Sequence, residues 1–394
     1  MLESDSGRSL CGVWISPEGQ ACLAWDRGKG PREVRSVAFS PFVWALERSV
    51  DDLIVGADVS NLSGEAPFNR LVRFEDIEDY KDFIKQKGRS NAIDWIRNLE
   101  QQFLLSCEGR LYSDMPFTEL RRMQLDIETA CSEEGGFSDP NHPDDRIIAI
   151  GLKLGQDIEA ISLDSFSDDS EKTLLKCLNE RIAEWDPDVI EGHNIFKFDL
   201  NYLRTRAKHL KAPISWGRFG QSATFRKSRL RVAERWIDYP RCDLPGRAVV
   251  DTFLLTQVYD ATARELMSYG LKDVARFLGI TPEDGGDRTY IDGSKIQEAF
   301  LNDRELFLKY LEDDLRETEG VADRLLPTYF EQTKTFPTTL QEACLKGTAS
   351  KVDLVFQEKY FHLKAACPMP GESSPFEGAY TASFKQGVFQ RVLH

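Results

Sequence analysis

The apolar positions of residues 1–118 alternate in short runs at first and later recur at helical spacing. Residues 11–16 and 21–26 flank a Pro-Glu-Gly-Gln turn and predict two strands, and residues 34–46 predict further strands. Between Glu75 and Leu104 the apolar side chains fall three or four positions apart, which predicts helix. They are Ile77, Tyr80, Phe83 and Ile84, followed by Ile93, Ile96, Leu99 and Phe103. We expect residues 1–118 to form a small, β-rich α+β domain.

The pattern changes at Leu120 and then alternates between strands and helices. Three strands are predicted first, at residues 122–129, 146–154 and 159–164. A helix then begins at Asp168, with Glu171 completing a capping box, and ends before Pro187. The following strand, helix, strand and helix are predicted at residues 188–194, 198–208, 247–253 and 268–279, and a last long helix, capped by Asn302 and Glu305, runs through Asp323. This order predicts an α/β fold, a mixed five-stranded sheet flanked by helices, over residues 119–330.

Residues 331–394 begin with a polar connector and a helix near residues 350–360. A Pro/Gly/Ser-rich stretch follows at residues 367–378. Residues 379–393 then predict two strands around a turn at Gln386–Gly387.

Asp126 and Glu128 are two positions apart in a predicted strand. Their carboxylates therefore point to one face, while Leu125 and Ile127 point to the other. Two carboxylates this close repel each other unless a cation lies between them, and oxygen ligands favour Mg²⁺ or Mn²⁺. The polar face of an exposed strand would give the same pattern, so the pair alone is weak evidence.

Two further acids and a tyrosine strengthen the case. Asp199 lies at the start of the helix after the fourth strand, near the strand end where functional groups of open α/β sheets collect. Nearby, Asn194 as a helix N-cap and Phe198 as a core residue are structural alternatives. Tyr310 and Asp314, four positions apart, share one face of the last helix. Four acids and a tyrosine suit a site in which two divalent ions clamp the attacking water and the leaving oxygen of a phosphodiester.

Three segments resemble the exonuclease motifs of family B DNA polymerases. LDIET at residues 125–129 matches the DxE motif, EGHNIFKFDLNYL at 191–203 matches N-x3-F-D, and YLEDD at 310–314 matches the Y-x3-D motif of the tyrosine subclass of DEDD exonucleases. The flanking residues 40–46, 109–129 and 268–279 also resemble that family. The resemblance covers nearly the whole chain. It implies the family's N-terminal domain at 1–118, a ribonuclease H-like 3′–5′ exonuclease domain at 119–330, and the start of a polymerase region at 331–394.

The resemblance implies a role for each of the five residues. Asp126 would bridge two divalent ions, Mg²⁺ or Mn²⁺. Glu128 and Asp314 would hold the ion that activates water, and Asp199 would act through the second ion, in part by way of water. Tyr310 would position the nucleophile.

Other residues take their expected roles from the same resemblance. Lys309 stands where the histidine subclass has its general base, which favours the tyrosine subclass. Thr129 would meet the terminal nucleotide. Asn194 and Phe198 would contact DNA or support the site, with the Phe198 ring supporting or wedging the frayed 3′ end.

Charge is unevenly distributed along the chain. The net charge is −15, yet residues 204–235 carry ten basic residues against the single acid Glu234. This segment, with Arg226, Lys227 and Arg229 as DNA-binding candidates, is suited to track a DNA backbone toward the acidic site. A solvated helix face and loop is the alternative interpretation. The ten residues are Arg204, Arg206, Lys208, Lys211, Arg218, Arg226, Lys227, Arg229, Arg231 and Arg235.

Composition excludes several classes of protein. A hydrophobic content of 41% excludes global disorder. The eight cysteines include no CxxC pair, so their spacing excludes a zinc knuckle and provides no disulfide framework. No run of 18 apolar residues and no signal-peptide core occurs. We expect a soluble, cytoplasmic, nucleoid-associated protein with reduced thiols and no membrane partner.

The sequence thus predicts a proofreading 3′–5′ exonuclease of DNA replication and repair that acts on a single-stranded 3′ end or frayed primer terminus. Motifs resembling the palm sequences SLYPS and DTDS do not occur, and residues 376–394 resemble the segment ahead of the first palm motif. We therefore expect no polymerase active site in this chain, and the missing polymerase half as its partner. Two alternatives stay open: a catalytically silent structural or DNA-docking module of a split or truncated polymerase, and a free-standing repair or RNA-processing exonuclease.

Overall fold

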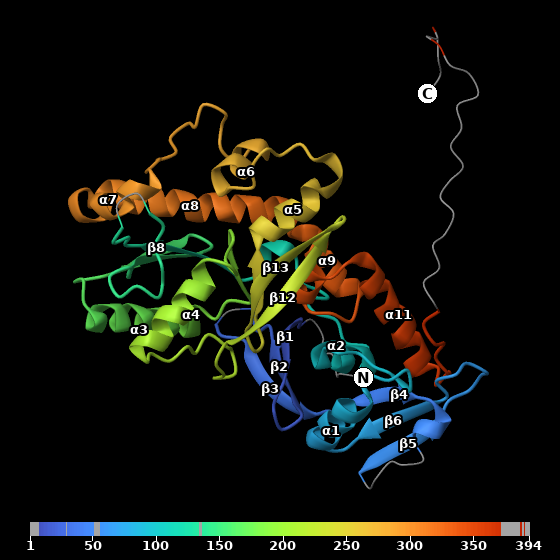
Figure 1. Ribbon diagram of the computed structural model, residues 1–394. Helices are drawn as coiled ribbons and strands as arrows, with labels where there is room; N and C mark the ends of the chain where they lie inside the picture. Colours follow the sequence, from blue (N-terminus) through green and yellow to red (C-terminus); the bar gives the residue numbers. More distant parts are fainter. Residues whose placement is uncertain are drawn as a thin grey trace.

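The computed structural model describes residues 8–28, 30–50, 56–133 and 136–371, together with Gly387 and Gln390. The strand pair predicted within residues 379–393 lies outside these ranges. The described chain divides into an N-terminal β-rich part, a central α/β part, and a C-terminal group of helices that returns to the N-terminal part (Figure 1).

The N-terminal part contains two antiparallel sheets. One has the order β1-β2-β3 and the other β5-β6-β4-β7. The elements are β1 (Leu10–Ile15), β2 (Gln20–Trp25), β3 (Glu33–Ala38), β4 (Phe42–Ala45), β5 (Ala57–Asn61), β6 (Arg70–Phe74), α1 (Ile77–Lys87), β7 (Ile93–Asp94) and α2 (Leu99–Ser106). The β-rich α+β prediction is confirmed.

The helix predicted through Ile93 and Ile96 is wrong at those two residues. Ile93 belongs to the short strand β7 and pairs with Ala45 of β4. The helix begins only at Leu99, because the Asn98 side chain accepts a hydrogen bond from the Gln101 amide and caps it there. Ile93 is apolar because it is buried in the sheet, and its distance from the next apolar residues happens to match helical spacing.

The central sheet has the order β10-β9-β8-β11-β14. Strands β8, β11 and β14 run parallel, and β9 and β10 are antiparallel to their neighbours. This confirms the mixed five-stranded sheet. Its strands are β8 (Arg122–Thr129), β9 (Ile147–Leu154), β10 (Asp157–Ser162), β11 (Val189–Gly192) and β14 (Ala248–Asp251).

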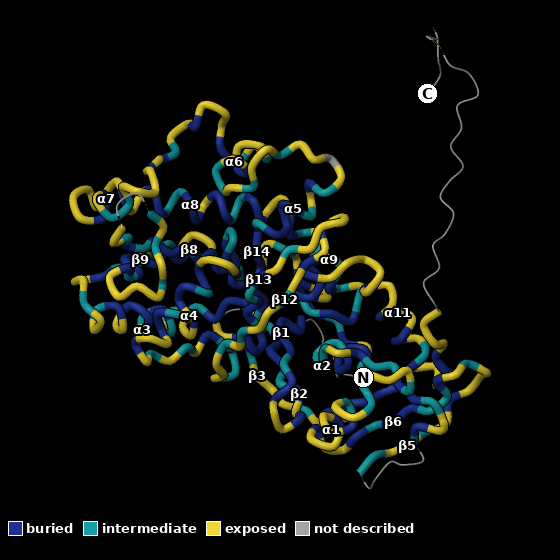
Figure 2. The backbone as a smooth tube through the Cα atoms, viewed as in Figure 1, coloured by how far each residue is buried: buried dark blue, intermediate teal, exposed yellow. Residues whose placement is uncertain are grey.

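Helices cover both faces of the central sheet. Helices α3 and α4 lie on one face and α8 crosses the other (Figure 1). Figure 2 shows the strands of this sheet buried between those layers. The helices are α3 (Asp168–Trp185), α4 (Asp199–Leu210), α5 (Thr252–Ala263), α6 (Leu271–Phe277), α7 (Ile296–Asn302) and α8 (Arg304–Leu325).

Helix α3 begins at Asp168 as predicted, but the predicted caps of α3 and α8 are each off by one residue. The cap of α3 is Ser167, whose hydroxyl accepts from the Ser170 amide. Glu171 does not close a capping box. It is buried and forms an ion pair with Arg206 of α4, at 2.6 Å. The cap of α8 is Asp303, which accepts from Leu306, because α7 extends through Asn302. In each case the residue next to the predicted cap accepts the hydrogen bond from the first turn of the helix.

The basic segment is divided between the end of α4, the loop that follows it and a β-hairpin. Strands β12 (Thr224–Val232) and β13 (Arg235–Asp243) pair in antiparallel register over their whole length. The ten basic residues also do not form one patch. Arg206 is buried against Glu171, and the buried Arg218 side chain pairs with Asp186 and Asp188.

The predicted polar connector after residue 330 is helical and partly buried. Polar side chains are tolerated there because they have partners. Gln341 accepts from the Val249 amide and donates to the Cys242 carbonyl, both at 2.9 Å, and Glu342 pairs with Arg241. The helices are α9 (Pro327–Thr335), α10 (Leu340–Leu345) and α11 (Thr348–His362).

Helix α11, predicted near residues 350–360, returns the chain to the N-terminal part. The Phe361 ring lies 4.5 Å from that of Phe42, centre to centre, and the two belong to one buried cluster with Trp44. The segment after α11 also bonds back, with Phe68 and Cys367 exchanging two backbone hydrogen bonds of 3.1 Å. Residues 331–371 therefore stabilise the N-terminal part as well as following the central one.

Candidate metal centre

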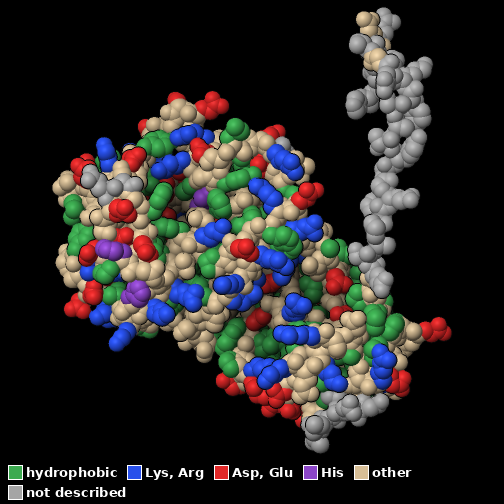
Figure 3. All heavy atoms as spheres, in the orientation of Figure 1, with side chains coloured by type: hydrophobic (Ala, Val, Ile, Leu, Met, Phe, Trp, Pro, Cys, Tyr) green, Lys and Arg blue, Asp and Glu red, His purple; other side chains and the backbone are tan. Residues whose placement is uncertain are grey.

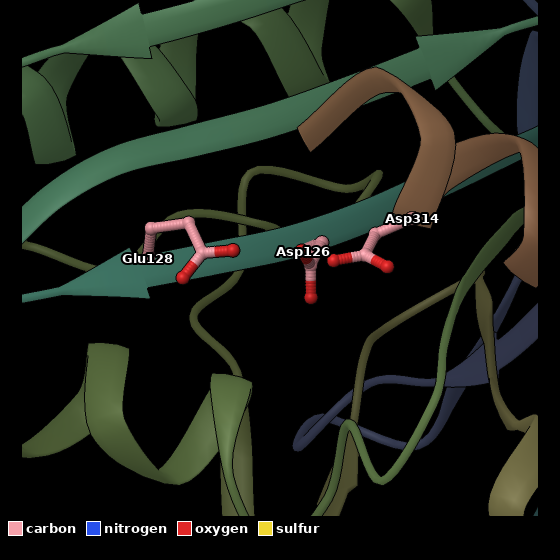
Figure 4. A group of neighbouring side chains, drawn as sticks. All are labelled: Asp126, Glu128 and Asp314. Atoms are coloured by element: carbon pink, nitrogen blue, oxygen red, sulfur yellow. The ribbon is translucent and has the colours of Figure 1, made fainter. Parts of the chain in front are cut away.

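Three acidic side chains converge over β8, the middle strand of the central sheet, on the face that α8 crosses. Asp126 and Glu128 lie side by side along β8, and Asp314 reaches toward Asp126 from α8 (Figure 4). Each offers a carboxylate oxygen, and these oxygens lie within 4.8 Å of one another. The residues come from positions 126, 128 and 314, so the site depends on how α8 crosses β8.

A glycine makes this close crossing possible. Gly151 of β9 is the partner of Asp126 across the strand pair. A Cβ atom on Gly151 would lie 2.8 Å from the Leu311 side chain of α8, closer than atoms can approach. Leu311 therefore packs directly over the strand backbone. Since Asp314 follows one turn later on the same helix, this contact sets how near Asp314 comes to β8.

Asp199 lies beside this group but outside it. Its carboxylate accepts a hydrogen bond of 3.1 Å from the Ile127 amide, between the two acids of β8. It is buried at the first position of α4. The side chain is thus anchored to the backbone of the strand that carries Asp126 and Glu128.

The turn that delivers Asp199 is held by an acid that sequence reasoning missed. Asp251, at the end of β14, accepts hydrogen bonds from the amides of Asn194 and Phe196, at 3.0 and 3.3 Å, and also caps α5. Asn194 is not a helix cap. It has the left-handed φ of 65°, and the helix begins after Phe198 without a side-chain cap.

The acidic group is electrostatically strained. Burial, followed by repulsion from Glu128, Asp199 and Asp314, raises the pKa of Asp126 well above its usual range. Burial and repulsion from Asp314 and Asp199 do the same to the pKa of Glu128. Negative charge is therefore unfavourable here without a cation.

Tyr310 borders the acids and has a lysine beside it. Its side chain is buried, and burial and the nearby acids raise its pKa, so the hydroxyl keeps its proton. The Lys272 ammonium donates to the Tyr310 hydroxyl at 3.1 Å and lies 4.6 Å from the ring centre. Lys272 was not among the predicted site residues, although it lies in the segment 268–279 that resembles the family.

Arg288 is a second cation at the site that sequence reasoning missed. Its guanidinium pairs with Asp314 and, at 3.1 Å, with Glu317 on the same helix. It comes from the loop between α6 and α7, where no periodic pattern singles it out. Only the fold brings it to α8.

The remaining predicted residues lie outside the acidic cluster, on the end of β8, before α4 and on the hairpin. Thr129 ends β8, and its hydroxyl is hydrogen-bonded to that of Ser138, at 2.8 Å. Phe198 is 38% exposed, so its ring is available at the surface and is not a core residue. On the hairpin, Arg226 pairs with Asp243, and Arg229 lies over the exposed Trp236 ring at 4.4 Å.

The donor set suits hard divalent cations. Three carboxylates within reach of one ion, with a fourth anchored beside them, offer only oxygen ligands, which Mg²⁺ and Mn²⁺ prefer. A cation would also relieve the repulsion that raises the carboxylate pKa values. The residues therefore fit a divalent metal.

Comparison with known proteins gives a consistent result. Residues 100–274 match the model of the DNA polymerase family B exonuclease domain. A DNA polymerase of Archaeoglobus fulgidus is 27% identical over 282 residues, which is 71% of this chain and 32% of the relative. DNA polymerase 2 of Aeropyrum pernix is 32% identical over 223 residues, 56% of this chain and 25% of the relative. The chain thus spans between a quarter and a third of these relatives.

A solved structure shares the fold. The family B DNA polymerase of Pyrobaculum calidifontis superposes with a TM-score of 0.69 at 19% identity, over 93% of this chain and 52% of that one.

Among the described residues, no helix is both long and apolar enough to cross a membrane. The eight cysteines are all unpaired thiols, as expected.

Proposed function

Because residues 100–274 match the exonuclease domain of family B DNA polymerases, we propose that this protein removes nucleotides from the 3′ end of DNA as a proofreading exonuclease. The observation that carries the proposal is the convergence of Asp126, Glu128 and Asp314 within 4.8 Å. We further propose that Mg²⁺ or Mn²⁺ occupies two positions there. The chain spans only part of its relatives, so their nucleotide-adding activity is not attributed to it.

Each acid takes a distinct role in this proposal. Asp126, between the other two, would be a ligand of both ions. Glu128 and Asp314 would hold the ion that activates the attacking water. Asp199, tied to the Ile127 amide, acts on the second ion in part through water. When bound, the ions supply Lewis-acid activation of the water and stabilisation of the leaving oxygen.

Tyr310 orients the attacking water with its protonated hydroxyl. Burial keeps that hydroxyl neutral. The Lys272 ammonium fixes its position by a hydrogen bond of 3.1 Å. Lys309, which corresponds to the general base of the histidine subclass, takes no part.

The DNA strand is proposed to approach from the hairpin side. Thr129 at the end of β8 meets the terminal nucleotide, Asn194 supports it, and the exposed Phe198 ring stacks on a frayed base. Basic side chains gather across the middle of the face shown in Figure 3, over the hairpin. Those proposed to contact the DNA backbone are Arg226, Lys227 and Arg229.

The deciding experiment uses single-stranded DNA labelled at its 5′ end, incubated with the protein with and without Mg²⁺. A ladder shortened from the 3′ end, seen only with Mg²⁺, is the expected result. Asp126→Ala should abolish it, because loss of the bridging carboxylate removes both metal positions; this corresponds to at least about a thousandfold loss of rate. An active Asp126→Ala protein would refute the assignment.

Two other outcomes would redirect the proposal. No cleavage by the folded wild-type protein would favour a DNA-docking module. Cleavage of RNA in preference to DNA would favour an RNA-processing exonuclease, because the 2′-hydroxyl is what distinguishes the two substrates.

A further inference from the structure

A second site lies at the far end of helix α8. A cavity of about 390 Å³ opens where the hairpin, α5, the end of α8 and the turn between α10 and α11 meet. This volume is within the range of small-ligand sites. Four cationic side chains line it, and none of the described residues around it is acidic. The cations are Arg231, Arg324, Lys346 and Lys351.

These cations have no counter-ion in the described part of the chain. No salt bridge there includes any of the four, although many other basic side chains of this acidic protein are paired. Lys351 is also buried; its ammonium donates to the side-chain carbonyl oxygen of Gln332 at 2.5 Å and lies 5.2 Å from the Tyr329 ring centre. Since burial disfavours an unpaired charge, an anion would stabilise this arrangement.

A neighbouring hollow lacks this excess of cations without acids. This second hollow, of about 640 Å³, shares Lys346 and Lys351 with the first and adds Arg97 and Arg226. Three acids also line it, namely Asp94, Glu342 and Asp353. Its charges therefore largely balance. Of these two adjoining hollows, the cavity at the end of α8 is the one lined by cations without acids.

Aromatic side chains complete the cavity. Tyr259 of α5 lines it and is 55% exposed, and Tyr329 of α9 forms part of its wall. An exposed ring next to several cations is the combination that binds single-stranded nucleic acid, because bases stack on the ring while phosphates meet the cations.

The position of the cavity selects a DNA strand as its occupant. Arg231 continues the row of exposed basic residues on β12 that includes Lys227 and Arg229. Arg324 lies ten residues beyond Asp314 on the continuous helix α8. At 1.5 Å per residue this is about 15 Å from the acidic cluster, or roughly four nucleotides of B-form rise. A strand that ends at the acids and follows the hairpin is long enough to reach the cavity.

We propose that this cavity is a second DNA contact, which holds a backbone phosphate several nucleotides from the 3′ end, with Tyr259 stacking on an adjacent base. The inference rests on the proposed exonuclease function, since it takes the same strand as substrate. It assigns a binding role to Arg324, Lys346, Lys351 and Tyr259.

The test measures how DNA affinity depends on salt. A fluorescent single strand of about 16 nucleotides is titrated in EDTA over a range of salt concentrations. The variant Arg324→Gln/Lys346→Gln changes two exposed side chains. The slope of log affinity against log salt should fall by about 1.4, because each phosphate contact contributes about 0.7 for single strands. Lys172→Gln/Lys176→Gln on α3, with the same change in net charge at exposed positions, should leave the slope unchanged.

A short substrate separates this inference from the proposed function. A dinucleotide is too short to span about 15 Å, so wild type and Arg324→Gln/Lys346→Gln should cleave it equally with Mn²⁺. Cleavage with an unchanged salt slope would overturn the second contact alone. A reduced slope without any cleavage would overturn the exonuclease and leave a DNA-binding cavity. If Lys172→Gln/Lys176→Gln lowered the salt slope as much as Arg324→Gln/Lys346→Gln, the inference would also be overturned. The same holds if dTMP or inorganic phosphate bound as tightly as the DNA strand.

Discussion

The two ends of the same three parallel strands carry buried charge in opposite ways. At the carboxyl ends of β8 and β11 lie Asp126, Glu128 and Asp199, with Asp314 above them. At the amino ends lies a network of three arginines and three aspartates. Its members are Arg32, Arg218, Arg247, Asp26, Asp186 and Asp188.

In this network acids and arginines are equal in number, and the pKa of Asp186 reflects its arginine partners. Burial alone would raise the pKa of Asp186, but Arg218 and Arg247 lower it to about 2. The network also joins parts of the fold, since Arg32 comes from the N-terminal part and the Arg121 amide, just before β8, donates to Asp188. By contrast, the pKa values of Asp126 and Glu128 are raised.

The difference separates structural charge from functional charge. Where each acid is paired with an arginine, the charged side chains neutralise one another, and no external cation is required. Where acids outnumber cations, the fold retains an unfavourable arrangement that an external cation would relieve. The cavity at the end of α8 is the reverse case, with cations that lack acids.

The largest expected effect on stability is at the balanced end. Arg218→Met should lower the free energy of unfolding by about 3–5 kcal/mol, because Asp186 and Asp188 would lose a buried partner. Urea denaturation at pH 7 measures this. Lys176→Met, which removes an exposed pair with Glu180, should cost less than about 0.5 kcal/mol. Similar values for the two variants would contradict the comparison.

At the unbalanced end, Tyr310→Phe should affect catalysis and not metal binding. Without its hydroxyl the attacking water is poorly oriented, so cleavage should slow by roughly tenfold to a hundredfold. Calorimetric titration with Mn²⁺ should give the wild-type affinity, because no carboxylate has changed. Loss of metal affinity would show that Tyr310 shapes the metal site itself.

His193 lies at the carboxyl end of β11 but should behave as a structural residue. Burial lowers its pKa to about 4, and its Nε2 pairs with the Tyr269 carbonyl at 2.7 Å. The unfolded chain, with a pKa near 6.5, takes up a proton first as pH falls, so stability contributed by His193 is lost between about pH 6.5 and 4. From pH 7 to 5 the loss is up to about 2 kcal/mol. His193→Gln should reduce the pH dependence of unfolding over that window; an unchanged dependence would argue against a neutral buried imidazole.

The smallest effect tests the comparison most directly. In EDTA at pH 7, Asp126→Asn should raise the free energy of unfolding by about 1 kcal/mol, because it removes one of the repelling charges. The matched change Asp186→Asn should lower it, because two arginines lose a counter-ion. Thermal unfolding of the two variants measures both. The same sign in both would show that local charge balance does not distinguish the two ends.

Several features of the site could be predicted from the sequence because they depend on local geometry. Side chains alternate along a strand, so the DxE spacing places Asp126 and Glu128 on one face whatever surrounds them. One helical turn likewise places Tyr310 and Asp314 together. The order of strands and helices also predicts the mixed sheet, since its elements follow one another along the chain.

Packing between distant segments decided the rest. Gly151 lets α8 approach β8 closely enough for Asp314 to join the acids, and Lys272 and Arg288 reach them from a helix and a loop that the sequence pattern does not link to the site. The basic segment, continuous in sequence, is divided by the fold into buried ion pairs and an exposed hairpin. Periodicity encodes which residues share a face of one element, whereas contacts between elements depend on volume and charge complementarity that no single segment contains.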